Sequence, residues 1–259
     1  MYFVENVCTP SSEAEIAYCE TAIEFGVLNH HALIAIDTYE QCLYVEDGNT
    51  EATEGVFQKM KKAILDILDK IDSVIRGFLD GIKSGSKNRL TADKYMSSAT
   101  AQINLNTDII EMQKVVDAQF LEMRKVVKMI SNVSGFDPDV VANTCDNINE
   151  KLHDNRNKIK DGAAGLVKTA SALAISDAAI KHIEECNGWK EKTRESVERM
   201  SRRGKIPPEK QTGMMKALNK ASQTLGNLVN SYTYITNGVI SAVNKGESQR
   251  AKAEKKNKK

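Results

Sequence analysis

The chain repeats its hydrophobic residues with the spacing of helices rather than strands. Between Gly55 and Lys83, apolar residues recur at alternating intervals of three and four, the a/d pattern of an amphipathic helix with one continuous seam. The seam residues are Phe57, Met60, Ile64, Ile67, Ile71, Val74 and Phe78. A helix over 55–83 extends about 42 Å, so it needs other long helices beside it. The pattern therefore assigns these residues to helix packing or assembly.

Further seams of similar period follow along the chain. One comprises Leu105, Ile109, Met112, Val116, Phe120, Met123, Val127 and Ile130, and the last comprises Met214, Leu218, Ala221, Leu225, Leu228, Tyr232, Ile235 and Val239. Weaker segments lie between them, with a break or a close helix approach expected at the GAAG motif, a helix end at Asn187-Gly188 and a short charged helix over 189–203. Short polar turns favour antiparallel neighbours. The sequence predicts an all-α, elongated antiparallel bundle of four to five long, coiled-coil-like helices over 55–244.

The N-terminal part has two shorter apolar stripes. Ile16, Cys19 and Ile23 precede Gly26, and Leu33, Ile34 or Ile36, Tyr39 and Leu43 follow Asn29. This arrangement predicts a small helical hairpin over 1–48, with the residues of the second stripe inside. The surrounding segment 1–54 is acidic throughout, with eleven Asp or Glu residues and no Lys or Arg.

The other end of the chain has the opposite charge. Residues 245–259 include seven basic and two acidic residues, a composition typical of a solvated, disordered tail. The net charge of +1 therefore hides a strong asymmetry between the ends. We expect an acidic hairpin segment at 1–54, a helical bundle at 55–244 and a basic disordered tail at 245–259.

Composition limits the compartment and the classes of protein. Hydrophobic residues make up 41% of the chain, enough for a core. The first residues lack a signal peptide, and no run of 18 apolar residues could span a bilayer. Five scattered cysteines without CxxC spacing indicate free thiols in a reducing compartment, the cytoplasm.

Residues with catalytic or metal-binding chemistry do not form a recognised motif. His30 and His31 are adjacent, so on a helix they point about 100° apart, and His153 and His182 are isolated. The acids Asp66, Asp69 and Asp72 could form a metal stripe, but a solvated face paired with nearby bases is the favoured interpretation. The sequence predicts no catalytic residue, no cofactor and no metal site, and hence a protein that is not an enzyme.

Two kinds of partner remain open besides other proteins or further copies of the chain. The basic tail could contact a polyanion such as nucleic acid non-specifically, through Lys252, Lys255, Lys256, Lys258 and Lys259, or could meet the acidic segment of another subunit. The alternative function is membrane insertion or interfacial binding by 162–180 or 55–83. Lys168 and Asp177 interrupt the first segment, and balanced charges on the second disfavour anionic lipid.

The N-terminal third is similar to a class of viral proteins. The YFVEN start, the acidic SSEAEIAYCETAIEFGVL and the long FQKMKKAILDILDKIDSVIRGFLDGIKSG helix resemble helical structural or internal virion proteins of large tailed bacteriophages. The resemblance covers about the first 85 residues and includes no catalytic or binding motif. It implies a non-enzymatic particle component that acts through coiled-coil-like contacts, located in the virion.

Overall fold

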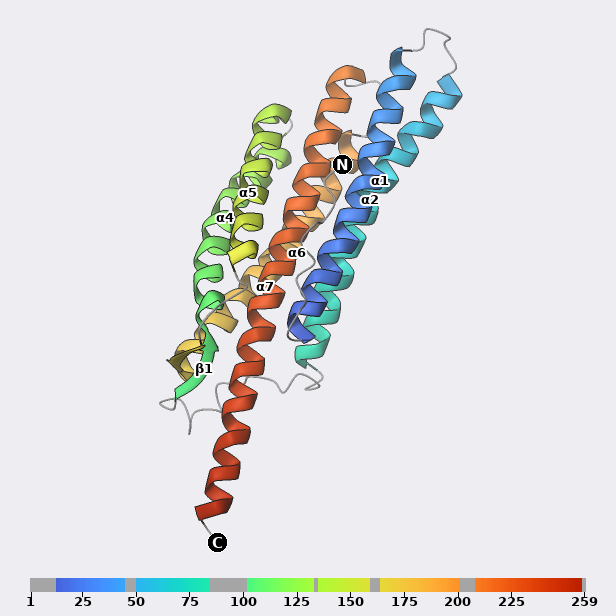
Figure 1. Ribbon diagram of the computed structural model, residues 1–259. Helices are drawn as coiled ribbons and strands as arrows, with labels where there is room; N and C mark the ends of the chain where they lie inside the picture. The colour runs from blue at the N-terminus through green and yellow to red at the C-terminus, as the bar shows by residue number, and fades with distance from the viewer. Residues whose placement is uncertain are drawn as a thin grey trace.

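The structure, a computed structural model, describes residues 13–44, 50–83, 102–132, 135–158, 164–200 and 208–257. Across these ranges it contains six helices and one two-stranded antiparallel sheet. The helices are α1 (Glu13–Tyr44), α2 (Thr50–Lys83), α4 (Thr107–Ser131), α5 (Pro138–Lys158), α6 (Thr169–Met200) and α7 (Pro208–Asn257), and the strands are β1 (Gln102–Asn106) and β2 (Ala164–Lys168). The helices form an elongated bundle, so the all-α prediction is confirmed (Figure 1).

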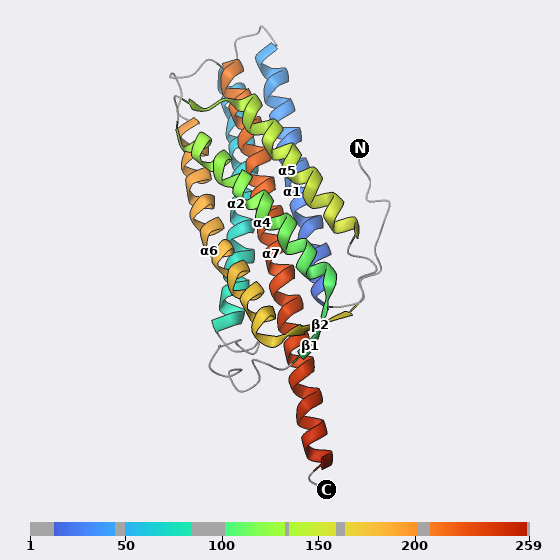
Figure 2. The same ribbon diagram turned by 90° about the vertical axis from the view of Figure 1, so that its left-hand side faces the viewer.

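Helix α7 is the central element of the bundle. It contacts α1, α2, α4, α5 and α6, which surround it in both views (Figures 1 and 2). Every residue between Gln211 and Ile240 is buried or half-buried. The predicted seam accounts for one side, and further apolar residues such as Met215 and Val229, together with small hydroxyl residues, occupy the others. Ser222 and Thr236 can be buried because their hydroxyls donate to the carbonyls of Leu218 and Tyr232, one turn earlier.

Polar side chains of α7 also fix its register against neighbouring helices. The Asn219 amide donates to Asn29 Oδ1 of α1 at 2.9 Å. On another side, Asn149 of α5 donates to Thr224 Oγ1 and accepts from the Asn227 amide, each at 2.9 Å. Such bonds are satisfied only in one alignment of the helices, so they contribute specificity as well as stability.

The predicted N-terminal hairpin is wrong. Residues 13–44 form the single helix α1, which continues through Gly26 and pairs with α2 and α7 instead of folding on itself. One glycine inside a helix costs about 1 kcal/mol, which is less than the burial of Phe25, Ala32 and Ile36 on a continuous face provides. Residues 1–12 lie outside the described part of the chain.

Two strands were not predicted. The seam residue Leu105 belongs to β1 rather than to a helix, and the second half of the GAAG motif begins β2. The strands pair antiparallel, with Ile103 opposite Val167 and Leu105 opposite Gly165. Ile103 and Leu105 face the core, while Gln102 and Asn104 are exposed, so β1 has the alternation of a half-buried strand. The chain leaves this sheet as α4 and α5 and returns to it before α6 (Figure 2).

The helix end expected at Asn187-Gly188 is also wrong, and the described residues of the expected helix over 189–203 are not a separate helix. Helix α6 continues from Thr169 to Met200 through Gly188, because its buried face continues through Ile183, Cys186 and Trp189 without interruption.

The basic tail is helical as far as Asn257, which corrects the prediction of disorder for 245–257. These residues continue α7: as far as Arg250 the helix still lies against the sheet, where Arg250 contacts Thr169. Beyond Arg250 the helix projects from the bundle (Figures 1 and 2). Extending an existing helix adds one hydrogen bond per residue without a new nucleus, and Ala and Lys are good helix formers. Lys252 and Lys255 are exposed, while Lys258 and Lys259 lie outside the described residues.

Candidate interaction surface

The predicted seam of α2 lies within the core. Phe57, Met60, Ile64, Ile67, Ile71 and Phe78 are buried and Val74 is half-buried. The ring of Phe57 meets that of Tyr39 of α1 edge-on, with centroids 5.2 Å apart. The seam is therefore closed by the chain's own helices and is not free for a partner.

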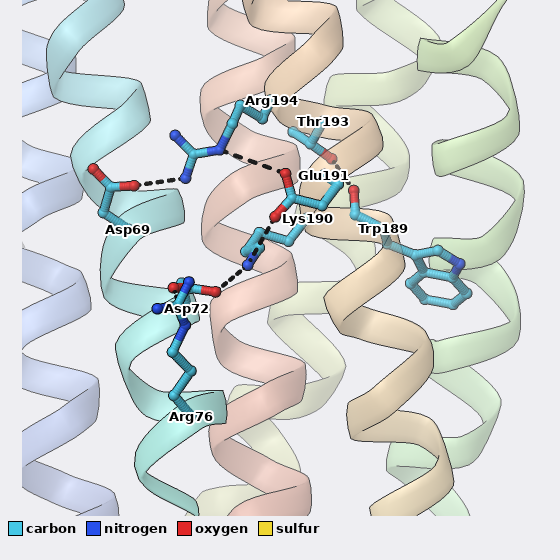
Figure 3. A network of polar contacts seen from close by, with 8 residues as sticks. All are labelled: Asp69, Asp72, Arg76, Trp189, Lys190, Glu191, Thr193 and Arg194. Carbon is cyan, nitrogen blue, oxygen red and sulfur yellow. Dashed lines mark hydrogen bonds and ion pairs between the residues drawn. The ribbon is translucent and has the colours of Figure 1, made fainter. Parts of the chain in front are cut away.

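The polar face of α2 faces α6 through a network of charges (Figure 3). The ammonium group of Lys190, whose side chain is 3% exposed, donates to Asp72 Oδ1 and lies 3.0 Å from Glu191 Oε1. Arg76 Nε contacts the other oxygen of Asp72 at 2.7 Å. The hydrogen bond from Lys190 lowers the pKa of Asp72 below its ordinary value, and the charges of Lys190 and Arg76 act in the same direction.

Further ion pairs extend this network along the same pair of helices. Arg194 donates to Asp69 at 2.6 Å and Lys61 donates to Glu198 at 2.6 Å. Asp66 lies 3.8 Å from Lys62. Each of the three acids considered as a metal stripe therefore has a cationic partner. Among the described residues, no three or more His, Cys, Asp or Glu side chains are grouped so that they could hold a metal ion. The network ties α2 to α6.

A cluster of aromatic rings joins α4, α6 and α7. His182 packs against Phe120 and Tyr232, with ring centroids 4.1 and 5.1 Å apart, and Trp189 stacks on Phe120 at 4.5 Å. The Tyr232 hydroxyl donates to Asp117 Oδ1 at 2.8 Å. Burial raises the pKa of Tyr232, and the charge of Asp117 adds to this effect. A phenol that is held protonated and hydrogen-bonded stabilises the packing of these helices.

The remaining histidines and the thiols are dispersed. His30 and His31 are exposed on α1, and His153 is exposed on α5. Cys145 and Cys186 are buried free thiols, and burial raises the pKa of Cys145 to about 12. Cys19 and Cys42 are half-buried free thiols. A raised pKa disfavours the thiolate, which is the nucleophilic form.

A half-open cavity of about 330 Å³ lies where β1 meets the projecting end of α7. Ile103, Gly246 and Arg250 are among its lining residues. The guanidinium group of Arg250 donates to Glu247 at 2.9 Å and to Thr169 Oγ1 at 3.5 Å. Its charge is thus engaged within the chain rather than directed at a ligand.

The outer face of α1 differs from every surface described above, because it exposes several large apolar residues together. Ile16 is 41% exposed, Ile23 57%, Val27 49% and Ile34 51%. Their spacings of seven, four and seven place them within about 40° of one another on a helix. We call these four residues the outer stripe. Ile16 and Ile23 thus face solvent, and of the two alternatives Ile34 and Ile36 it is Ile36 that is buried. The expectation that Leu33 lies inside is wrong, since its side chain is 39% exposed.

The opposite face of α1 carries its contribution to the core, through Phe25, Ala32, Ile36 and Tyr39. Helix α1 is therefore apolar on two faces, one against the bundle and one toward solvent. The sequence carries the signal, since the stripe repeats with its own a/d spacing, but the hairpin prediction divides α1 into two short helices instead of giving one helix two apolar faces. Clustered apolar exposure of this kind marks interaction surfaces, whereas single exposed residues such as Leu121 on α4 are common.

The charge around the outer stripe is of one sign. Helix α1 contains six acids and no Lys or Arg. Glu24 pairs with Lys70 of α2, and Glu40 pairs with Lys216 of α7. Glu20 and Asp37 are exposed, and neither has an ion-pair partner within the described part of the chain. They lie on the face of the outer stripe, one near each end.

No family model, no curated protein and no solved structure matches this chain. In the described ranges, no helix is both long and apolar enough to cross a membrane. Segment 162–180 does not form one helix, because β2 occupies 164–168. In the helical part of the segment, Ala172, Ser176 and Ala179 of α6 are buried within the bundle. Fold and surface together define an all-helical bundle with an exposed apolar and acidic helix face.

Proposed function

We propose that this protein is a structural or assembly protein that acts through helix–helix contacts and catalyses no reaction. The outer stripe is the observation that carries the proposal. Four large apolar side chains on one helix face extend about 27 Å, which is the length over which a partner helix can pack. Burying them against a partner would stabilise the complex by about 25 cal/mol for each Å² of apolar area removed from water.

The polar clusters support the same proposal. The Asp72–Lys190 network and the Tyr232–Asp117 bond connect helices of this chain to one another, and their charged and polar groups already have partners. Active sites hold perturbed groups open to a substrate, whereas these groups are closed by contacts within the bundle. The bundle is accordingly proposed as a rigid support for the face of α1.

The N-terminal resemblance extends the proposal to a component of a tailed-bacteriophage particle. The charged ends would then guide assembly, with the acidic helix α1 at one end of the chain and the exposed Lys252 and Lys255 on the projecting end of α7 at the other. Those lysines could also contact a polyanion without sequence preference.

Size measurement in the native source tests the proposal. We expect the 28.6 kDa chain to elute from gel filtration of a native extract in a larger assembly. The double variant Ile23→Ser/Val27→Ser should no longer join that assembly and should elute at the volume of the free chain. Leu121→Ser, which removes an isolated exposed apolar residue from α4, is the matched control and should remain assembled. Elution of the wild type at its monomer mass would contradict the proposal.

A further inference from the structure

Acids lie on both sides of the Ile23–Ile34 part of the outer stripe, and this arrangement restricts what can cover it. Written as a heptad, the face of α1 has Ile16, Glu20, Ile23 and Val27 in successive seam positions, followed by His30, Ile34 and Asp37. The apolar centre thus lies between two exposed carboxylates. They are 17 residues apart, or about 25 Å along the helix axis.

A second copy of α1 is a poor occupant of this face. Because α1 has acids and no Lys or Arg, pairing two copies would bring carboxylates together without a compensating cation from either helix. Like charges brought together at an interface oppose association, and burying an unpaired carboxylate adds a desolvation cost. The projecting end of α7 supplies cations, but beyond Val243 its only apolar residues are alanines.

We infer that the outer stripe binds an amphipathic helix of another protein, one whose apolar seam is bracketed by two Lys or Arg residues about 25 Å apart. The seam covers Ile23, Val27 and Ile34, while the two cations pair with Glu20 and Asp37. This inference rests on the proposed function and adds the chemistry of the partner. The charge pairs select the partner and its alignment, and the apolar contact supplies most of the affinity.

The test uses the full chain and synthetic helical peptides as probes. Each probe is a 25-residue peptide with Leu at its a and d positions and two seam-flanking residues 17 positions apart. Those two residues are Lys in the first peptide, Gln in the second and Glu in the third. Fluorescence anisotropy at low salt should show that the Lys peptide binds about tenfold more tightly than the Gln peptide, and the Glu peptide more weakly still.

The charge-swap variant Glu20→Lys/Asp37→Lys identifies the acids responsible. We expect it to reverse the order, so that the Glu peptide binds best. Ile23→Ser/Val27→Ser should weaken the binding of all three peptides at least tenfold, whereas Leu121→Ser should change none of the three affinities. All five altered positions are exposed, so circular dichroism should give an unchanged melting temperature for each of the three variants.

Several outcomes would overturn the inference. These are equal affinity for the three peptides, an order that the charge swap does not reverse, and no binding of any peptide. Concentration-dependent self-association that Ile23→Ser/Val27→Ser abolishes would assign the face to a second copy. Binding to phosphatidylcholine vesicles lost in the same variant would assign it to a membrane. If no peptide binds but the chain elutes in a larger assembly from the native extract, only the inferred chemistry of the partner is rejected. If the chain elutes as a monomer from the native extract, the proposed function is rejected.

Discussion

The ammonium group of Lys190 lies almost wholly out of solvent, between α6 and α2, and depends on the carboxylate of Asp72 (Figure 3). The two partners of this ion pair are not equivalent. Asp72 has a second cationic partner in Arg76 and keeps partial contact with water. Lys190 has only Glu191 as a further partner among the described residues, and that side chain is 55% exposed.

Removing either partner should therefore have unequal effects on stability. Asp72→Asn leaves a buried cation poorly compensated, and we expect it to lower the free energy of unfolding by about 2 kcal/mol. Lys190→Met keeps the buried stem and leaves Asp72 paired with Arg76, so it should change stability by less than about 1 kcal/mol. Chemical denaturation of both variants measures the difference. An equal or larger loss in Lys190→Met would contradict this assignment.

The pH dependence of the same pair has a defined sign. The pKa of Asp72 is lowered in the folded state, so its contribution is present above the unfolded Asp pKa of about 3.9 and is lost as pH falls through the folded value. The stability deficit of Asp72→Asn should thus be constant between about pH 5 and 7 and shrink below about pH 4. A deficit that grows in acid would contradict this linkage.

At the scale of elements, glycines of α7 permit close helix approach. A Cβ at Gly226 would lie 2.9 Å from the ring of Phe25 in α1, whereas a Cβ at Gly77 of α2 would meet nothing within 4 Å. These positions form a matched pair, since both are inside helices and only one is in contact.

Alanine substitution should therefore act in opposite directions at the two positions. Gly77→Ala should stabilise the protein by up to about 1 kcal/mol through helix propensity. Gly226→Ala should destabilise it by about 1–2 kcal/mol, because the Phe25 ring must move. Adding Phe25→Leu should relieve part of the loss by coupling between the two sites. Thermal melts that shift in the same direction for both single variants would contradict the close packing.

The elements that the sequence predicted are those with one strong seam. The 3–4 spacing from Phe57 to Phe78 identified α2 because one apolar face and one charged face alternate over many turns. The same rule failed for α1, because apolar residues of its two faces alternate along the sequence and give only short stripes of helical spacing, which suggested a hairpin. It also failed for β1, which is five residues long and merges with the seam of α4 through Leu105.

The candidate surface was missed for a tertiary reason. Whether Ile23 or Ile36 faces the core depends on where α2 and α7 lie, and the local pattern is apolar at both positions. Burial of Lys190 within the charged run WKEKTRESVERM was equally unpredictable, because its partner Asp72 lies 118 residues away in the chain. Long-range pairing decided each case.

At the scale of the whole molecule, the bundle ends before the chain does. Val243 is buried against the core, and beyond Arg250 the side chains of α7 that the structure describes are exposed. The end of α7 projects from the bundle (Figure 1). This projecting helix therefore contributes to surface charge more than to the core.

Truncation should separate these two contributions. Removing residues 251–259 should shift the melting temperature by less than about 2 °C, because no described side chain lost is buried. It should weaken retention on an immobilised polyanion at low salt, since Lys252 and Lys255 are removed. A large fall in the melting temperature would show that this end of α7 is part of the folded core.

We propose above all that the outer stripe of α1 is an interface for another helix. A photo-crosslinking amino acid placed at Ile23 in the full chain, and at Leu121 as the matched exposed position, tests it in the native source. We expect a discrete adduct heavier than 28.6 kDa from position 23 and none from position 121. Absence of an adduct at position 23, or equal labelling at both positions, would contradict the claim.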